Sequence, residues 1–214
     1  MQLRGGFWLS LALTAALAGC GQRPARPPAP AVAVTHFVNA RDNARAPALA
    51  AHFVAFSFDY PSTWTLDPRT GSPTASNFVK VARRDAEQTE LESVAVGSFH
   101  GPGAGPVEPA LLPALLDDLE SQAAAGFRAY RRVDAGAVTI DGRPARQIRF
   151  TAAGFAGGRP LRVFGRIILL PGPSADGVVL LLQATDASRD FRSVEDVGVA
   201  GQTPVVLRSF RLGA

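Results

Sequence analysis

Apolar and polar residues alternate in short stretches over most of the chain from about residue 51 onward. In FSFDYP, Phe56 and Phe58 alternate with Ser57 and Asp59, which is the period of a strand with one buried face. The same reasoning predicts further strands over residues 64–66, 77–83, 93–99, 127–134, 137–140, 145–151, 161–170 and 178–185.

Two of these predicted strands have no polar face. The runs RIILLP at 166–171 and VVLLLQ at 178–183 are continuously apolar. Such runs are typical of central strands that are covered on both faces, and the covering layers are usually helices. We therefore expect these two segments in the middle of the sheet.

The segment ARQIRFT shows the opposite pattern. We expect Ile148 and Phe150 to point inward and Arg149 and Thr151 to point outward. Asp141-Gly142, just before this segment, is a strong signal for a hairpin turn. Gly157-Gly158 and the run PGPSADG mark two more turns. These turns predict an antiparallel meander.

One helix is predicted from a start between Pro109 and Pro113 to about residue 125, and Gly126 is its natural stop. Spacings of three and four form one apolar stripe, made by Leu112, Leu115, Leu116, Leu119 and Ala123. The acidic residues Asp117, Asp118 and Glu120 lie off this stripe and are expected to be solvated.

A second helix is predicted near the end of the chain, with Thr203 as its N-cap and Pro204 as its first residue. Before it, Ser193 and Asp196 have the spacing of a capping box. The order of elements is several strands, a helix, an antiparallel meander and a closing helix. This order indicates an α+β fold.

Residues 51–213 resemble PsbP-like domains, which include bacterial DcrB-like lipoproteins. The resemblance rests on FSFDYPSTWTL, an aromatic strand running into Tyr-Pro-x-x-Trp, and on the later hairpin AVTIDGRPARQIRFT. It implies an antiparallel sheet sandwiched between helices, the α/β/α sandwich of that family. It also implies a protein that binds or assists other proteins. We find no positions that match the metal-binding residues of plant members.

The motif residues Tyr60, Pro61 and Trp64 have two interpretations. They are expected to form a turn whose aromatic rings seal one end of the core. Alternatively, the rings could provide a stacking site for a ligand.

Residues 1–19 have the parts of a secretory signal. Arg4 supplies the positive charge, and residues 7–17 form an apolar run that is too short to span a membrane. The string Leu-Ala-Gly-Cys then ends at Cys20, the only cysteine of the chain. It resembles the lipobox of bacterial lipoproteins. The alternative is a secreted protein with a chance cysteine after its cleavage site.

In that family the cysteine carries fatty acyl chains such as palmitate, which anchor the protein to a membrane. Cys20 would then be unavailable for disulfide or redox chemistry. Gly21 follows it, whereas an Asp at that position favours the inner membrane. The resemblance therefore implies an exported, lipid-anchored protein on the outer membrane, facing the periplasm, if the bacterium has two membranes. With one membrane, the protein would lie on its outer face.

Residues 20–50 are predicted to be the lipidated cysteine and a tether, and residues 51–214 the folded domain. Prolines 24, 27, 28 and 30 favour an extended, semi-stiff stalk. Within the tether, residues 32–38 are apolar enough for a short strand, but the pattern is weak.

Composition and charge limit the classes of function that this chain is expected to have. The chain has 214 residues, of which 47% are hydrophobic, enough for one sizeable core. A net charge of +4 is mild for this length, so we expect no nucleic-acid partner. Lys80 is the only lysine, and we attribute the preference for arginine to a GC-rich genome.

The sequence gives no sign of catalysis. His36, His52 and His100 lack metal-binding spacings, so we expect isolated histidines and no metal site. There is no Gly-x-Ser-x-Gly elbow, no Ser-x-x-Lys around Lys80 and no phosphate-binding Gly-Lys-Ser/Thr motif. We therefore expect no enzyme activity and no cofactor.

Arginines recur along the predicted meander and are the candidate binding residues. If neighbouring strands present them on one face, they would bind an acidic protein or anionic headgroups. The candidate patch consists of Arg128, Arg132, Arg146, Arg149, Arg162 and Arg166. The alternative is that they decorate solvent-facing strand positions.

The combined expectation is a non-catalytic envelope lipoprotein that binds a protein partner as an accessory or assembly factor. The alternative function is a periplasmic carrier or sensor that binds a small apolar or anionic ligand inside the sandwich.

Overall fold

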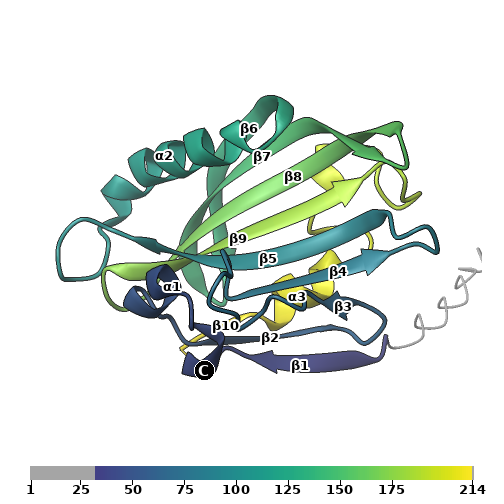
Figure 1. The fold of residues 1–214 in the computed structure, drawn as a ribbon. Coiled ribbons are helices and arrows are strands. Elements are labelled where there is room, and N and C mark those ends of the chain that lie inside the picture. Colours follow the sequence, from purple (N-terminus) through teal and green to yellow (C-terminus); the bar gives the residue numbers. More distant parts are fainter. Residues whose placement is uncertain (1–31, 214) are drawn as a thin grey trace, which may run out of the picture. The chain divides into compact units, whose positions relative to one another are not determined.

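Seven antiparallel strands form the main sheet, in the order β3-β4-β5-β9-β8-β7-β6 (Figure 1). The computed structural model describes residues 32–213. The strands of this sheet are β3 (Thr65–Leu66), β4 (Val79–Arg84), β5 (Glu90–His100), β6 (Arg128–Ile140), β7 (Arg143–Ala156), β8 (Arg159–Pro171) and β9 (Asp176–Thr185). The two continuously apolar runs form β8 and β9, which lie in the middle of the sheet as predicted.

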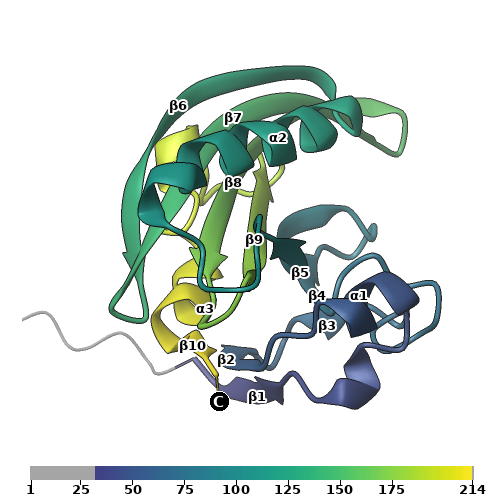
Figure 2. The same ribbon diagram turned by 90° about the vertical axis from the view of Figure 1, so that its left-hand side faces the viewer.

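One face of the sheet is covered by the helix α2 (Leu112–Ala125), which follows the short 3-10 helix η2 (Pro109–Leu111) (Figure 2). Leu112 and Leu116 of α2 pack in one core cluster with Ile148, Phe150 and Ile167 of the sheet. The predicted helix and its apolar stripe are therefore confirmed, and Ile148 and Phe150 point inward as expected.

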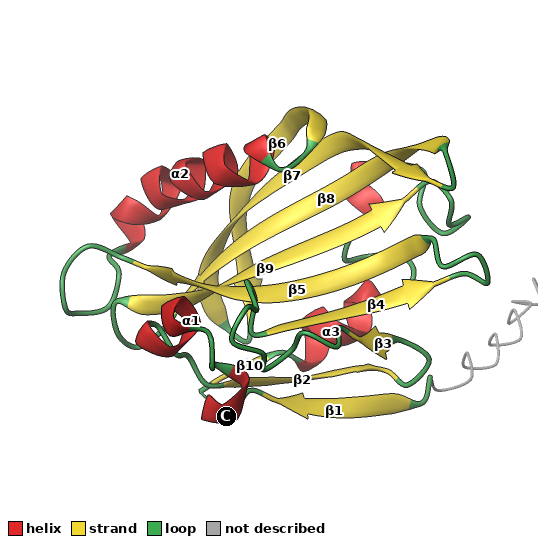
Figure 3. Ribbon diagram, viewed as in Figure 1, coloured by secondary structure: helices red, strands yellow, loops and turns green. Residues whose placement is uncertain are grey.

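The other face is covered by a small second sheet and by short helices (Figure 3). The strands β1 (Val34–Val38), β2 (Phe56–Pro61) and β10 (Arg211–Leu212) form this second sheet, in the order β1-β2-β10. The helical segments of the layer are η1 (Arg41–Asn43), α1 (Pro47–Ala51), η3 (Val194–Asp196) and α3 (Thr203–Ser209). The aromatic rings of Phe56, Phe58 and Phe210 stack between the layers.

The α+β class, with an antiparallel sheet between two layers, is confirmed.

Alternate residues of the two apolar runs in β8 and β9 pack into the two different hydrophobic cores. Ile168 and Leu180 pack toward the second sheet, whereas Ile167 and Leu181 pack toward α2. The layer opposite α2 differs from the expected all-helical layer because strands of the second sheet supply part of it.

The two glycine-containing turns have the predicted geometry. Asp141 and Gly142 have φ values of 51° and 71°, and Gly157 and Gly158 have values of 54° and 77°. Two successive left-handed residues are typical of the type I′ turn, whose twist matches that of a hairpin. These turns connect β6 to β7 and β7 to β8.

The folded unit begins earlier than predicted. β1 pairs with β2 from Val34 opposite Pro61 to Val38 opposite Ser57, and Leu49 of α1 is buried in the core. Residues 34–51 therefore belong to the folded unit, not to the tether. The sequence pattern is weak here because most β1 side chains are exposed and the strand is held through its backbone.

The signal segment 1–19, Cys20 and the tether residues 21–31 lie outside the described residues. Within residues 32–213, no helix is long and apolar enough to cross a membrane.

β6 is one continuous strand, where the sequence predicted two. Its register with β7 shifts between Arg128 and Arg131 and again between Arg132 and Asp134. Ala129, at the first shift, has a φ of 49°. Bulges of this kind are common on edge strands, where they discourage pairing with another chain.

Trp64 closes one end of the core as expected. It is buried, and its Nε1 donates a hydrogen bond to Oε1 of Gln202 at 2.7 Å. Tyr60 belongs to the same core cluster. The interpretation of these rings as a seal is therefore confirmed.

The closing helix α3 begins at Thr203, so that its N-cap is Gln202 and not Thr203. The buried carboxylate of Glu92 replaces a side-chain cap. Its Oε2 accepts hydrogen bonds from the backbone N–H groups of Gln202 and Thr203, at 2.8 and 3.1 Å. The spacing of residues in the sequence gives no sign of this long-range cap.

Candidate functional site

The six candidate arginines lie on β6, β7 and β8, but the two faces of the sheet divide them. Arg149 lies between Ile148 and Phe150, which pack under α2, so its own side chain points to the opposite face. Arg166 is its cross-strand partner and lies on that same face. Arg132 pairs with Phe150 and lies on the α2 face. One continuous patch of all six arginines is therefore not formed.

Arg149 and Arg166 make internal contacts. Arg149 forms a two-pronged ion pair with Asp134, with 2.9 Å between Nε and Oδ1. This hydrogen-bonded partner raises the pKa of Arg149. Arg166 donates from Nε to Oε1 of Gln147 at 2.7 Å. Burial, and secondarily the charge of Arg149, lower the pKa of Arg166. The side chains of both residues thus make contacts within the fold and are not free to bind a partner.

Arg132 holds α2 against β6. Its Nη1 lies 2.9 Å from Oδ1 of Asp117 and 2.9 Å from Oε2 of Glu120. The Tyr130 hydroxyl donates to Glu120 at 2.9 Å, and burial, reinforced by this contact, raises the pKa of Tyr130. Two of the acidic residues expected to be solvated are therefore partners of a predicted binding arginine.

Arg146 lies near Arg132, whereas Arg128 lies apart from the other candidates. Arg146 lines a small hollow of about 120 Å³ beneath α2, together with Arg132. The Arg128 guanidinium lies over the ring of the exposed Phe155, 5.1 Å from its centroid. A cation over an aromatic face is an attractive contact, so Arg128 belongs to this local pair.

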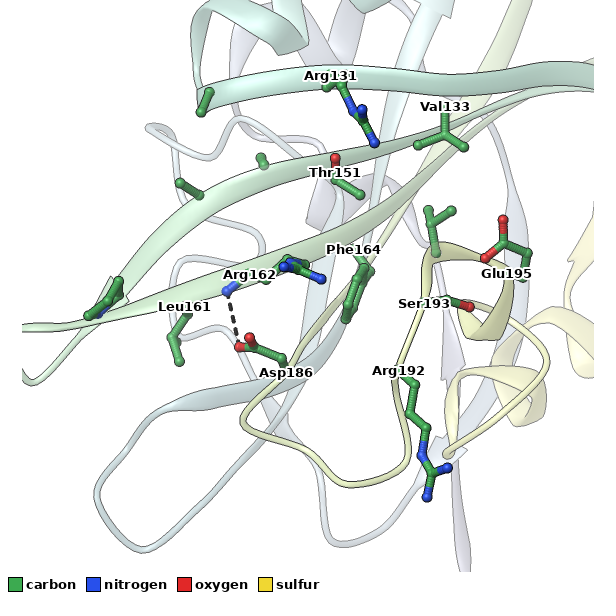
Figure 4. A pocket seen from close by; sticks show the side chains of 15 residues that line it. Arg131, Val133, Thr151, Leu161, Arg162, Phe164, Asp186, Arg192, Ser193 and Glu195 are labelled. Atoms are coloured by element: carbon green, nitrogen blue, oxygen red, sulfur yellow. Dashed lines mark hydrogen bonds between the residues drawn. The ribbon is translucent and has the colours of Figure 1, made fainter.

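Arg162 is the one candidate arginine that lines the cleft beside η3, whereas Arg166 lines a second hollow, of about 520 Å³, beside α3. The cleft has a volume of about 740 Å³ and lies between strands β6–β8 and the segment that leads from β9 into η3 (Figure 4). Arg131 and Val133 lie on its β6 side, and Arg192 and Glu195 lie on the side of η3 (Figure 4). Figure 4 also shows Phe164 between these two sides.

Three guanidinium groups of the cleft are available for binding. Among the described residues, the side chains of Arg131, Arg162 and Arg192 form no ion pair and no hydrogen bond. Arg162 and Arg192 form hydrogen bonds only through their backbone groups. An unpaired guanidinium offers a planar set of donors that matches a carboxylate or a phosphate.

The cleft also contains negative charge. Asp186 accepts a hydrogen bond from the backbone N–H of Arg162 at 3.0 Å and donates its own N–H to the Arg162 carbonyl at 3.1 Å. These contacts fix the segment that follows β9. The Ser193 hydroxyl lowers the pKa of Glu195, so its carboxyl is ionised at neutral pH.

The segment around η3 is ordered by the predicted capping box. Oδ2 of Asp196 accepts hydrogen bonds from the backbone N–H groups of Arg192 at 2.8 Å and Ser193 at 2.9 Å. These bonds lower the pKa of Asp196. The sequence pattern predicts this turn. It gives no sign that Arg192 and Glu195 lie near the arginines of the meander.

The histidines differ from the expectation that all three are isolated. His52 follows α1, His100 ends β5 and Asp176 begins β9. The Nδ1 atoms of both histidines lie 2.8 Å from the same Oδ1 of Asp176. His36 lies apart from this group and contacts Asp59 at 2.7 Å. The segments that meet here are far apart in the sequence, so the spacing of the histidines along the chain gives no sign of the pair.

The charge of Asp176 is set by two opposing effects. Burial acts to raise its pKa, but the hydrogen bonds from His100 and His52 together outweigh burial and lower the pKa. Within residues 32–213, these three side chains are the group of histidine and acidic residues close enough together to hold a metal ion.

Comparison with known proteins finds matches among solved structures alone. No protein-family model matches the chain, and no curated protein matches it. Solved structures match the chain at low sequence identity. The solution structure of cyanobacterial PsbP (CyanoP) from Synechocystis sp. PCC 6803 has 14% identity and a TM-score of 0.49, over 85% of this chain and 94% of that one.

The second is the crystal structure of LpqN, described as involved in cell envelope biogenesis of Mycobacterium tuberculosis. It has 13% identity and a TM-score of 0.48, over 84% of this chain and 91% of that one. With identities and TM-scores this low, neither likeness supports a conclusion about the activity or the partners of this chain.

Proposed function

We propose that this chain is a non-catalytic, lipid-anchored protein of the bacterial envelope that binds a protein partner as an accessory or assembly factor. The Leu-Ala-Gly-Cys string at Cys20, after an apolar segment, supports the anchor. In a bacterium with two membranes, the expected place is the outer membrane, facing the periplasm. The observation that carries the binding role is the open cleft with the unpaired guanidinium groups of Arg131, Arg162 and Arg192.

The partner presents an acidic, extended segment. Guanidinium groups on both sides of the cleft bind carboxylates in two-pronged fashion. Phe164, Leu161 and Val133 line the space between them, so apolar side chains of the same segment also find contacts. Asp186 and Glu195 add fixed negative charges that select for position, because a misplaced acidic residue is repelled.

The cleft supports binding more than catalysis. Its lining contains no histidine, the commonest general base. The lowered pKa of Glu195 makes this carboxylate a weak base at neutral pH. The Ser193 hydroxyl therefore has this weak base beside it, which is poorly suited to activate a nucleophile.

Charge reversal in the cleft tests the binding role. The chain is expressed with its native signal in its own host, cross-linked in intact cells and recovered with its covalently attached proteins. The double variant Arg131→Glu and Arg162→Glu should lose its cross-linked partner. Arg143→Glu is the matched control, because Arg143 is also an exposed arginine but begins β7 at the end far from the cleft.

Two outcomes contradict the proposal. Retention of the same partner by the double variant would show that the cleft does not bind it. Equal loss of the partner in the Arg143→Glu control would show that general positive charge, not the cleft, is responsible. Recovery of a small ligand in place of a protein would favour the alternative function as a carrier or sensor.

A further inference from the structure

A second group of polar side chains lies apart from the cleft, where β5 ends and β9 begins. His100 and Asp176 are cross-strand partners in these two strands. His52 joins them from the residue after α1. The side chains of His52, His100 and Asp176 are 37%, 47% and 23% exposed, so solvent and ions reach all three.

The group is unusual because two imidazoles share one carboxylate oxygen. Both Nδ1 atoms lie 2.8 Å from Oδ1 of Asp176. The two rings are 4.6 Å apart and inclined by 35°. Oδ1 of Asp176 accepts hydrogen bonds from both rings. The lone pairs of Oδ2 and of Nε2 in each ring are then directed elsewhere.

The backbone around the acidic residue is fixed. The N–H of Gly172 donates to the Asp176 carbonyl at 3.1 Å, and the N–H of Gly101 donates to the Ala175 carbonyl at 2.8 Å. The first bond closes the turn between β8 and β9, and the second ties this turn to the residue that follows β5. Two of the three side chains are thus held in place on the rigid sheet.

The spacing suits a metal ion. One donor atom from each of the three side chains can be chosen so that all lie within 4.8 Å of one another. Ligand atoms around a tetrahedral zinc ion, at about 2.0–2.1 Å from the metal, lie roughly 3.3 Å apart. With Nδ1 of each histidine and Oδ1 of Asp176 as ligands, the 2.8 Å contacts would open by roughly half an ångström to admit the ion. Each imidazole would then carry its proton on Nε2.

We propose that His52, His100 and Asp176 form a binding site for a divalent transition-metal ion of the zinc class. Two imidazoles and one carboxylate are donors that suit zinc, and three protein ligands leave one position for water. The ion would connect the end of α1 to the main sheet, so that binding stabilises the segment that precedes β2.

The chain contains its own control. His36 contacts Asp59 at 2.7 Å through Nδ1 and Oδ1, the same pair of atoms as in the proposed site. Among the described residues this pair is not part of a group of three donors. A single histidine and a single carboxylate bind zinc far more weakly than three converging ligands.

The test is a zinc titration of the full chain against a chromogenic zinc chelator. We expect one zinc ion per chain, and at least a tenfold loss of affinity in His52→Gln, in His100→Gln and in Asp176→Asn. The variants His36→Gln and Cys20→Ser should bind zinc like the parent, and the latter excludes the thiol as a ligand. Zinc should also raise the melting temperature of the parent but not that of His100→Gln.

A parent chain that does not bind zinc would overturn the proposal. So would affinities of the three site variants equal to that of the His36→Gln control. Because a variant could fail to fold, circular dichroism without metal must first match that of the parent. If one variant fails this criterion, the other two carry the test, since each removes a different ligand.

Discussion

Glu92 offers the sharpest test of how the two layers are joined. Its side chain is 0% exposed, and its Oε1 lies 2.7 Å from Nη2 of Arg83. Its Oε2 accepts the two backbone N–H groups at the start of α3. Replacement by Ala removes the ion-pair partner of Arg83 and the acceptor of two backbone N–H groups, and it leaves a cavity. Breaking a buried ion pair in this way costs about 3–5 kcal/mol of unfolding free energy.

Glu92→Gln is the milder variant. Its amide oxygen still accepts the N–H groups of Gln202 and Thr203, and Arg83 keeps Ser188 at 2.8 Å and Asp190 at 2.9 Å as partners. We therefore expect a loss of about 1–3 kcal/mol, the cost of one poorly satisfied buried group. The assay is urea denaturation of both variants, followed by the fluorescence of Trp64.

The pH dependence supplies a second readout. Burial raises the pKa of Glu92 above its ordinary value, against the opposing effects of the two backbone bonds and Arg83. A raised pKa in the folded state means that its contribution to stability is complete below the unfolded pKa and is lost as pH rises through the folded pKa. Glu92→Gln should remove this contribution to the dependence of the unfolding free energy on pH.

The reasoning would be refuted by a Glu92→Ala variant whose unfolding free energy lies within about 1 kcal/mol of the parent, the range of an exposed ion pair. It would also be refuted if Glu92→Gln were the less stable of the two variants, because Gln keeps the oxygen that caps α3.

Three further predictions concern the core, the surface and the anchor. Gly165→Ala would place its Cβ inside van der Waals contact with the ring of Phe150, so we expect the unfolding free energy to fall by about 1–3 kcal/mol in denaturation. Gly136→Ala, with open space around it, should be tolerated. Arg132→Ala removes two partly exposed ion pairs and should cost about 0–1 kcal/mol, and a larger loss would show that α2 depends on them. Cys20→Ala should move the protein from the membrane to the soluble fraction, and an unchanged membrane fraction would contradict the lipoprotein interpretation.

Much of the fold follows from local patterns. The apolar runs of β8 and β9 require cover on both faces, and Asp141-Gly142 favours one hairpin geometry, so both features could be predicted. The pattern does not specify β1, because its side chains are mostly exposed and its pairing with β2 is made by the backbone. The sequence therefore predicts a boundary of the folded unit that lies after β1 and α1.

The site was harder to predict than the fold. Alternation along a strand tells which face a side chain takes, and it places Arg149 correctly. It cannot give the register of neighbouring strands, which brings Asp134 to Arg149 and Gln147 to Arg166. The pattern likewise could not show that Arg192 would come to lie near the meander.

The two histidines illustrate the same limit. His52 and His100 lie in different segments with no spacing relation, and they meet only because β5 ends and β9 begins beside the end of α1. Long-range contacts of this kind depend on the packing of layers. The sequence pattern of a single chain contains no direct record of that packing.

The central claim is that the cleft binds a protein partner, and site-specific photo-cross-linking in intact cells tests it most directly. A photoreactive residue at Val133, which lines the cleft, should capture an acidic segment of a single envelope protein. The same residue at Val199, which is 74% exposed and is not among the residues lining the cleft, should capture none. Equal capture at both positions, or capture at neither, would contradict the claim.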